Sequence, residues 1–143
     1  MKKGFTLIEL LVVIAIIAML SSLSVVALNS ARAKSRDARR LSDIKQIRTA
    51  LEMYYDNNQT YPNQSAIELG GSSAACLSST NGFNAVCSGT TYMQIVPKDP
   101  MSSANVKYVY NQTGGGAGYT IEYKLEGSTA SSTANASSMG YGN

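Results

Sequence analysis

A long apolar run near the start of the chain gives way to an amphipathic segment. The residues of Phe5–Leu28 are apolar or small except for one threonine, one glutamate and three serines, and no charge follows Glu9 until Arg32. Such a run has the length of a membrane-spanning helix, about 20 residues. Neither Gly nor Pro occurs from Phe5 to Thr60, which favours one unbroken helix through both segments.

In the amphipathic segment, apolar residues recur at spacings of three or four, as on one face of a helix. The stripe predicted to be buried consists of Ala38, Leu41, Ile44, Ile47, Leu51 and Tyr54. The charged side chains that lie largely off it are Arg39, Arg40, Lys45, Arg48 and Glu52. Asn57-Asn58 and Tyr61-Pro62 predict the end of the helix. A helix over residues 5–56 is about 78 Å long at 1.5 Å per residue, so its apolar half must be buried in lipid or against copies of itself.

Beyond the helix the pattern changes to short strand-like runs. Residues 63–91 are rich in Ser, Ala, Gly, Asn and Thr and predict an irregular connection. Three runs predict strands, at Tyr92–Val96, Val106–Tyr110 and Tyr119–Leu125. The last run alternates in polarity, and its tyrosines and those of the preceding run are expected to pack rather than bind bases. We therefore expect an α+β fold with a long N-terminal helix on a small antiparallel sheet, and a flexible tail at 127–143.

Composition narrows the classes of function. The chain has 143 residues, a formal net charge of +3 and no histidine, so the commonest general base and metal ligand is missing. With no convergent pair of acids either, we expect no catalytic residue, cofactor or metal site. Cys76 and Cys87 enclose ten residues; outside the cytoplasm a disulfide is the expected state, and two free thiols are the alternative.

The acid inside the apolar run requires an explanation. A carboxylate at the centre of a membrane helix costs about 2.5 to 3.5 kcal/mol, so Glu9 needs a partner. The segment Gly4-Phe5-Thr6-Leu7-Ile8-Glu9-Leu10-Leu11 resembles the prepilin signature of type IV pilins and of type II secretion pseudopilins. The resemblance implies cleavage by a prepilin peptidase after Gly4, N-methylation of Phe5 and a role for Glu9 in assembly. The new Phe5 amine of one subunit could then pair with Glu9 of a neighbour.

The resemblance continues along the chain. Residues 43–62 are similar to the helix end of major pseudopilins and short pilins, and residues 95–125 are similar to their sheet region. The resemblance implies a leader at 1–4, a transmembrane and filament-core helix at 5–31, a globular pilin domain at 32–126 and the tail at 127–143. Nothing acidic follows Glu126, so the calcium site of major pseudopilins is not expected.

The implied function is that of a structural subunit of a type IV pilus or pilus-like filament. The precursor would lie in the bacterial cytoplasmic membrane, surrounded by lipid, and would meet the peptidase and the pilus assembly machinery. The product would be a homo-oligomeric helical filament at the cell surface.

Several alternatives remain open. A pseudopilin of a type II secretion system shares all of this chemistry, whereas a membrane-anchored monomeric domain that binds DNA or another ligand would not polymerise. Ordinary signal cleavage after Ala27 or Ala33 would release a soluble domain. The run Arg32–Arg48 carries seven basic and two acidic residues. It is a candidate for DNA or lipid phosphates, but the favoured interpretation is a solvated face that pairs with acids of adjacent subunits. These charges oppose the positive-inside rule for the orientation that the resemblance implies.

Overall fold

The computed structural model describes residues 4–101, 106–127 and 131–135. They divide into two compact units, Met1–Ser35 and Arg36–Asn143. The helix α1 spans Leu7–Asn58, so the predicted single helix is confirmed, with its end two residues beyond the expected one. The predicted boundary between residues 31 and 32 lies one turn before the boundary between the two units.

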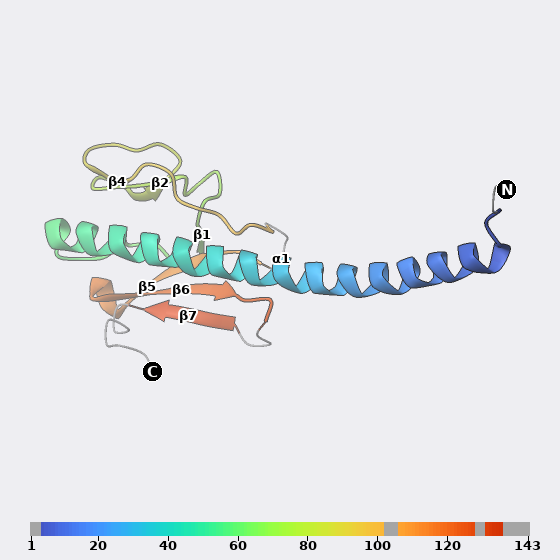
Figure 1. The fold of residues 1–143 in the computed structure, drawn as a ribbon. Coiled ribbons are helices and arrows are strands. Elements are labelled where there is room, and N and C mark those ends of the chain that lie inside the picture. The colour runs from blue at the N-terminus through green and yellow to red at the C-terminus, as the bar shows by residue number, and fades with distance from the viewer. Residues whose placement is uncertain (1–3, 102–105, 128–130, 136–143) are drawn as a thin grey trace. The chain divides into compact units, whose positions relative to one another are not determined.

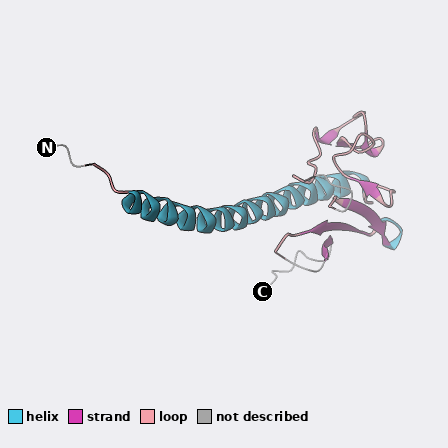
Figure 2. Ribbon diagram, turned by 90° about the vertical axis from the view of Figure 1, so that its right-hand side faces the viewer, coloured by secondary structure: helices cyan, strands magenta, loops and turns pink. Residues whose placement is uncertain are grey.

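The globular unit contains the second half of α1 and two antiparallel sheets rather than the single sheet expected. The strands are β1 (Ile67–Glu68), β2 (Cys76–Ser78), β3 (Gly82–Asn84), β4 (Thr91–Met93), β5 (Val109–Thr113), β6 (Gly118–Lys124) and β7 (Ser131–Asn135). The larger sheet has the order β1-β5-β6-β7 and the smaller has the order β3-β2-β4. Within this unit the helix runs between the two sheets (Figure 1), as the view turned by 90° also shows (Figure 2).

The larger sheet follows the sequence pattern closely. Strand β6 pairs with β5 from Val109↔Glu122 to Thr113↔Gly118, and the short 3-10 helix η1 (Gly114–Gly116) makes the turn between them. Along β6, Tyr119 and Ile121 are buried while Glu122 and Lys124 are exposed. The expected alternation is therefore present. The bounds of the strands predicted at 92–96 and 106–110 differ by one to three residues from those of β4 and β5.

Two segments differ from the expectation. The stretch 63–91, expected to be irregular, contains β1, β2 and β3, because cross-strand backbone hydrogen bonds form there without a long apolar run. Within the expected tail, residues 131–135 form β7, which pairs with β6 in register from Thr120↔Asn135 to Lys124↔Ser131. Strand β7 lies at the edge of the larger sheet. A polar sequence can form such a strand because one face of an antiparallel sheet can remain in solvent. The rest of the expected tail after Asn135 lies outside the described residues.

The core of the globular unit lies where α1 meets the strands. It contains Ile44, Ile47, Leu51, Tyr54, Leu77, Phe83, Tyr108, Tyr110, Tyr119 and Ile121 among others. Four residues of the predicted stripe are buried, but Ala38 and Leu41 are exposed, and Arg40, predicted to lie off the stripe, is fully buried. At its N-terminal end, the buried face of this part of α1 is therefore rotated relative to the predicted stripe. The ion pairs of Arg40 explain this rotation.

Candidate functional site

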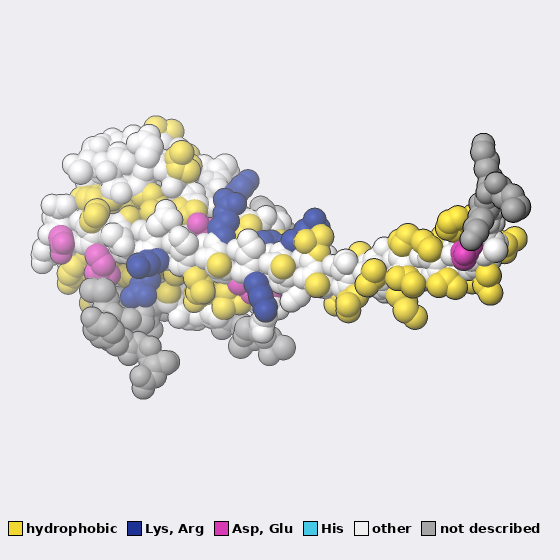
Figure 3. Space-filling view, in the orientation of Figure 1, with side chains coloured by type: hydrophobic (Ala, Val, Ile, Leu, Met, Phe, Trp, Pro, Cys, Tyr) yellow, Lys and Arg dark blue, Asp and Glu magenta, His cyan; other side chains and the backbone are white. Residues whose placement is uncertain are grey.

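In the N-terminal unit, the apolar side chains of α1 have no partners within the described chain. Every described residue from Gly4 to Arg32 is exposed, and Figure 3 shows the apolar side chains along its surface. The helix is long and apolar enough to cross a membrane by length and composition. Leaving so much apolar area in water is unfavourable at about 25 cal/mol per Å², so this surface has to be covered by lipid or protein.

Two serines of this apolar helix, Ser22 and Ser24, satisfy their hydroxyl groups with backbone carbonyls of the same helix. Ser22 Oγ donates to the Met19 carbonyl oxygen at 2.8 Å, and Ser24 Oγ donates to the Leu20 carbonyl oxygen at 2.8 Å. Such bonds to the preceding turn are the usual solution for serine in an apolar helix. These hydroxyls therefore need no water and do not oppose burial of the helix.

The first turn of α1 is closed by Thr6 and Glu9. The Glu9 carboxylate accepts a hydrogen bond from the Thr6 backbone N–H at 2.8 Å and another from Thr6 Oγ1 at 2.6 Å. In return, the Glu9 backbone N–H donates to Thr6 Oγ1 at 3.3 Å. This reciprocal pattern is a capping box, which satisfies backbone donors that would otherwise lack partners. Glu9 thus has a local structural role that the sequence interpretation did not include.

The predicted cleavage site lies just outside this cap. Gly4 and Phe5 precede α1 and are exposed, Phe5 by 79%. A Cβ atom added to Gly4 would meet nothing within 4 Å. Gly4 and Phe5 therefore lie in the non-helical segment just before the turn that Thr6 and Glu9 close, and nothing in the described chain covers the Gly4–Phe5 bond.

In the globular unit, Arg40 joins α1 to two distant loops. Its Nε and Nη2 atoms donate to the two Asp99 carboxylate oxygens at 2.7 and 3.1 Å. Its Nη1 atom donates to Asp37 at 2.7 Å and to Glu126 at 2.8 Å. Because the guanidinium is planar and always charged, it can hold these carboxylates in fixed directions. Asp99, foremost, raises the pKa of Arg40.

The neighbouring contacts tighten this cluster. Arg36 donates to both Glu126 carboxylate oxygens, at 2.6 and 2.5 Å, and the Asp37 carboxylate accepts the backbone N–H groups of Glu126 and Gly127. The approach of the Asp99 loop depends on Gly70, where φ is +71° and an added Cβ would lie 2.7 Å from the Pro97 carbonyl oxygen. Two of the seven basic residues of Arg32–Arg48 thus pair within the chain rather than with adjacent subunits.

Acid titration should reveal the Glu126 pairs. Hydrogen bonds from Arg36, and then from Arg40, lower the pKa of Glu126 from 4.5 to about 2. A lowered folded-state pKa means that this contribution to stability is fully present above about pH 4.5 and is lost as the pH falls towards 2. We expect Glu126→Gln to flatten the fall of Tm across this window, measured by thermal unfolding of the full chain in detergent. The matched control is Glu122→Gln on β6, since Glu122 is exposed; an unchanged slope in Glu126→Gln would contradict the assignment.

Further along α1, two acids bind tyrosine hydroxyls in the core. Tyr108 donates to Asp43 at 3.1 Å, and burial raises the pKa of Asp43. Tyr61 donates to Glu52 at 3.0 Å and Tyr119 donates to it at 3.4 Å. The Tyr61 and Tyr119 rings pack edge to face, with a centroid distance of 4.7 Å. The tyrosines therefore belong to the core, as predicted, and do not form an open stacking platform.

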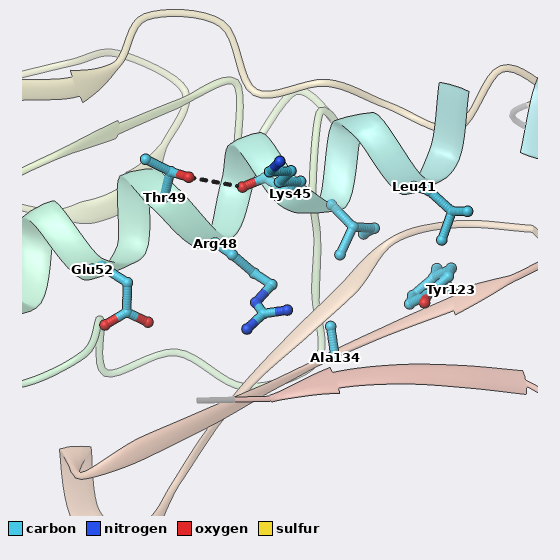
Figure 4. Close-up of a pocket in the computed structure, with 8 residues that line it drawn as sticks. Leu41, Lys45, Arg48, Thr49, Glu52, Tyr123 and Ala134 are labelled. Carbon is cyan, nitrogen blue, oxygen red and sulfur yellow. Dashed lines mark hydrogen bonds between the residues drawn. The ribbon is translucent and has the colours of Figure 1, made fainter. Parts of the chain in front are cut away.

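Beside this network lies a groove between α1 and the larger sheet (Figure 4). It has a volume of about 390 Å³ and is lined by Leu41, Ile44, Lys45, Arg48, Thr49, Glu52, Tyr123 and Ala134. Its helix side carries two cations, Lys45 and Arg48, and one acid, Glu52. The sequence pattern does not predict this groove, because it depends on β7 and on the exposure of Leu41.

The remaining candidate chemistry is structural. Cys76 and Cys87 form a disulfide with a Cα–Cα distance of 5.9 Å, and it ties β2 to the segment before β4. Within the described residues, no group of three or more acids, cysteines or histidines is placed to hold a metal ion. The carboxylates that do converge, around Arg40, are occupied by its guanidinium.

Comparison with known proteins gives two family matches. The model for the prokaryotic N-terminal methylation motif matches residues 1–25, and the model for type II secretion system (T2SS), protein G matches residues 26–137. The type II secretion system core protein G of Escherichia coli (strain K12) is 43% identical over 61 residues, which are 43% of this chain and 42% of that protein. The same protein of Pectobacterium carotovorum subsp. carotovorum is 40% identical over 62 residues, which are 43% and 40% of the two chains.

Pilus proteins are also similar to this chain. The type IV major fimbrial protein FimA of Dichelobacter nodosus is 42% identical over 52 residues, covering 36% of this chain and 33% of that protein. In the two core protein G relatives the match spans about two fifths of their length. No solved structure matches the chain.

Proposed function

The chain belongs to the family of type II secretion system protein G, and from this premise we propose that it is a non-enzymatic subunit of a pilus-like filament. The precursor is held in the bacterial cytoplasmic membrane by α1, is cut between Gly4 and Phe5 by a prepilin peptidase, and is N-methylated on Phe5. The mature chain then leaves the lipid and polymerises through α1 with the help of an assembly machinery.

One observation carries this proposal most directly. The apolar half of α1 has no partner within the described chain and starts at a capped turn that contains an acid. Lipid and the helices of other copies are both apolar, so transfer from one to the other exposes little apolar surface to water. Cleavage would create a free amine on Phe5, four residues before Glu9 in the chain, and this amine of a neighbouring subunit would provide a cation for the acid in a dry environment.

The choice between a secretion pseudopilus and a surface pilus rests on the family matches. The protein G model covers most of the globular unit, whereas the fimbrial relatives match a shorter segment. We therefore favour the pseudopilus, with the type IV pilus as the second candidate. Deleting the gene and measuring both secreted enzymes and surface filaments separates them, because a secretion defect without loss of surface filaments is expected only for the pseudopilus.

Processing is tested by a single substitution. We expect Gly4→Leu to abolish cleavage, so that the intact mass in native membranes stays that of the chain from Met1 while the wild-type mass is that of a chain starting at methylated Phe5. Because an added side chain at Gly4 meets nothing within 4 Å, the variant should still fold, which its unchanged Tm would demonstrate. A normally shortened Gly4→Leu product would refute the assigned site. A wild-type chain starting after Ala27 or Ala33 would refute the filament function.

A further inference from the structure

We propose that Arg32 and Lys34 bind the phosphates of anionic phospholipid headgroups at the far surface of the membrane and so hold the subunit at a fixed depth until it enters the filament. The inference rests on the membrane location in the proposed function and adds to it a contact with a stated class of lipid. Both residues belong to the same compact unit as the apolar half of α1.

The two cations lie at the depth of the headgroups when the apolar run fills the hydrocarbon layer. From Ile8 to Leu28 the helix is about 30 Å long, which is the thickness of that layer. Arg32 and Lys34 follow Leu28 by four and six residues, hence by about 6 and 9 Å along the axis. In Figure 3, basic side chains follow where the apolar surface of the helix ends. Since both side chains are long and flexible, they reach the phosphates from these positions.

Neither cation has a partner within the described chain. Arg32 and Lys34 are exposed, and no hydrogen bond or ion pair joins either of them to a described residue. The one acid among the described residues of their unit is Glu9, about 35 Å away along the helix. By contrast, the next two paired cations, Arg36 and Arg40, are bound by acids of their own chain. Two positive charges beside the apolar surface are thus left for an external anion.

The placement of these two side chains around the helix favours lipid over a protein or a nucleic acid. Residues two apart in an α-helix are about 200° apart around its axis, so Arg32 and Lys34 lie on opposite sides of α1. A protein surface or a DNA duplex that docks on one side can bind only one of them, whereas lipid surrounds a membrane helix on all sides. The guanidinium can bind a phosphate through two parallel hydrogen bonds, and the ammonium binds one as a point charge.

The contact is most important after processing. Removal of the leader takes Lys2 and Lys3 away from the cytoplasmic end of the span, while Arg32 and Lys34 stay at the other end. Anionic headgroups then give this basic flank a counter-charge on the side where the positive-inside rule does not expect one. Entry into the filament has to break these contacts, so they set a threshold for leaving the membrane.

Fluorescence quenching in vesicles tests the contact on the full chain. The chain contains no tryptophan, so Leu28→Trp places a single reporter at the end of the apolar run, in a background that all variants share. The protein is purified from its own membranes and reconstituted in phosphatidylcholine vesicles that contain either brominated phosphatidylcholine or brominated phosphatidylglycerol. We expect phosphatidylglycerol to be favoured at the reporter by about threefold in relative association constant.

Charge variants identify the residues responsible. Arg32→Gln combined with Lys34→Gln should lower the preference to about one, and about 0.5 M salt should lower it in the unmodified background because exposed charges are screened. The exchange Arg32→Lys with Lys34→Arg keeps both charges and should keep the preference. The matched control is Lys98→Gln with Lys124→Gln, which removes two exposed cations of the globular unit and should leave the preference unchanged.

A second measurement avoids the reporter. Native mass spectrometry of the chain in detergent with added phosphatidylglycerol should show about two retained lipids on the wild type, one per cation, and none on the Arg32→Gln/Lys34→Gln variant. Equal association of the two lipids, or a preference that survives this double variant, would overturn the inference. A short DNA duplex that abolishes the preference would assign the two cations to nucleic acid and would also overturn it.

The intact mass of the same preparations separates this inference from the proposed function. A chain that starts at methylated Phe5 but shows no lipid preference would overturn the lipid contact alone. A chain that still starts at Met1 would overturn the proposed processing, while the vesicle measurement would still decide the lipid contact.

Discussion

Replacing Arg40 by leucine is expected to lower the free energy of unfolding of the globular unit by about 3 to 5 kcal/mol, the cost of removing one partner from a buried ion cluster. Arg40 is fully buried, and its loss leaves the Asp99 carboxylate, 1% exposed, without its cation. Asp37 and Glu126 lose one bond each but keep solvent and other donors. Most of the destabilisation should therefore arise at Asp99.

The measurement is urea unfolding of the full-length chain in detergent, followed by the near-ultraviolet circular dichroism of its tyrosines. The matched control is Arg39→Leu, because Arg39 is the adjacent residue and is exposed; surface substitutions usually change stability by no more than about 0.5 kcal/mol. Arg40→Lys should fall between the two, since an ammonium keeps the charge but cannot bind Asp99 through two parallel bonds. A free energy of unfolding for Arg40→Leu within about 1 kcal/mol of wild type would contradict the central role of this cluster.

The Arg40 cluster also shows where sequence patterns stop being informative. A period of three to four predicts α1 because helix geometry alone places such residues on one face, and Ile44, Ile47, Leu51 and Tyr54 are buried as expected. Arg40 is buried because of Asp99 and Glu126, which lie 59 and 86 residues away. No local periodicity contains those partners, so Arg40 was assigned to the solvent face and Ala38 and Leu41 to the core.

The same distinction applies to the strands. Strand β6 was predictable because one of its faces is buried and the other exposed, which imposes a period of two. The short strands β1, β2 and β3 have no such alternation: all three residues of β2 are buried, and β1 has only two residues. These strands form because β1 pairs with β5 and β2 pairs with β3 and β4, and the disulfide ties β2 to the chain before β4. The sequence itself shows only a connection rich in small polar residues.

The candidate assembly site was predictable to the extent that its motif is local. Gly4, Phe5 and Glu9 were singled out because an acid in an apolar run is costly and because the segment resembles a processing signal. The hydrogen bonds of Glu9 to Thr6 were not predicted, although a threonine followed three residues later by a glutamate is itself the sequence pattern of a capping box. This second role complicates the usual interpretation of a Glu9 substitution, because alanine removes a helix cap and a charge together.

Glu9→Gln separates these two roles and is expected to abolish filaments. Glutamine can accept the hydrogen bonds of Thr6 and preserve the capping box, but it cannot neutralise the Phe5 amine of a neighbouring subunit. Loss of a cap costs about 1 kcal/mol, whereas an unpaired charge buried in an apolar bundle costs about 3 to 5 kcal/mol. This larger cost would arise in every subunit of the filament. Glu9→Ala loses both interactions and should assemble no better than Glu9→Gln.

Filaments counted by electron microscopy and quantified after shearing give the readout, and the intact mass of the membrane-bound chain verifies that each variant is still cut after Gly4. The control is Thr6→Val, which removes the Thr6 hydroxyl from the cap and leaves the charge of Glu9 intact; we expect it to retain filaments at a moderately reduced yield. Abundant filaments from Glu9→Gln together with their loss in Thr6→Val would mean that Glu9 acts through the helix start alone. The opposite result would identify its charge as the group that a neighbouring subunit requires.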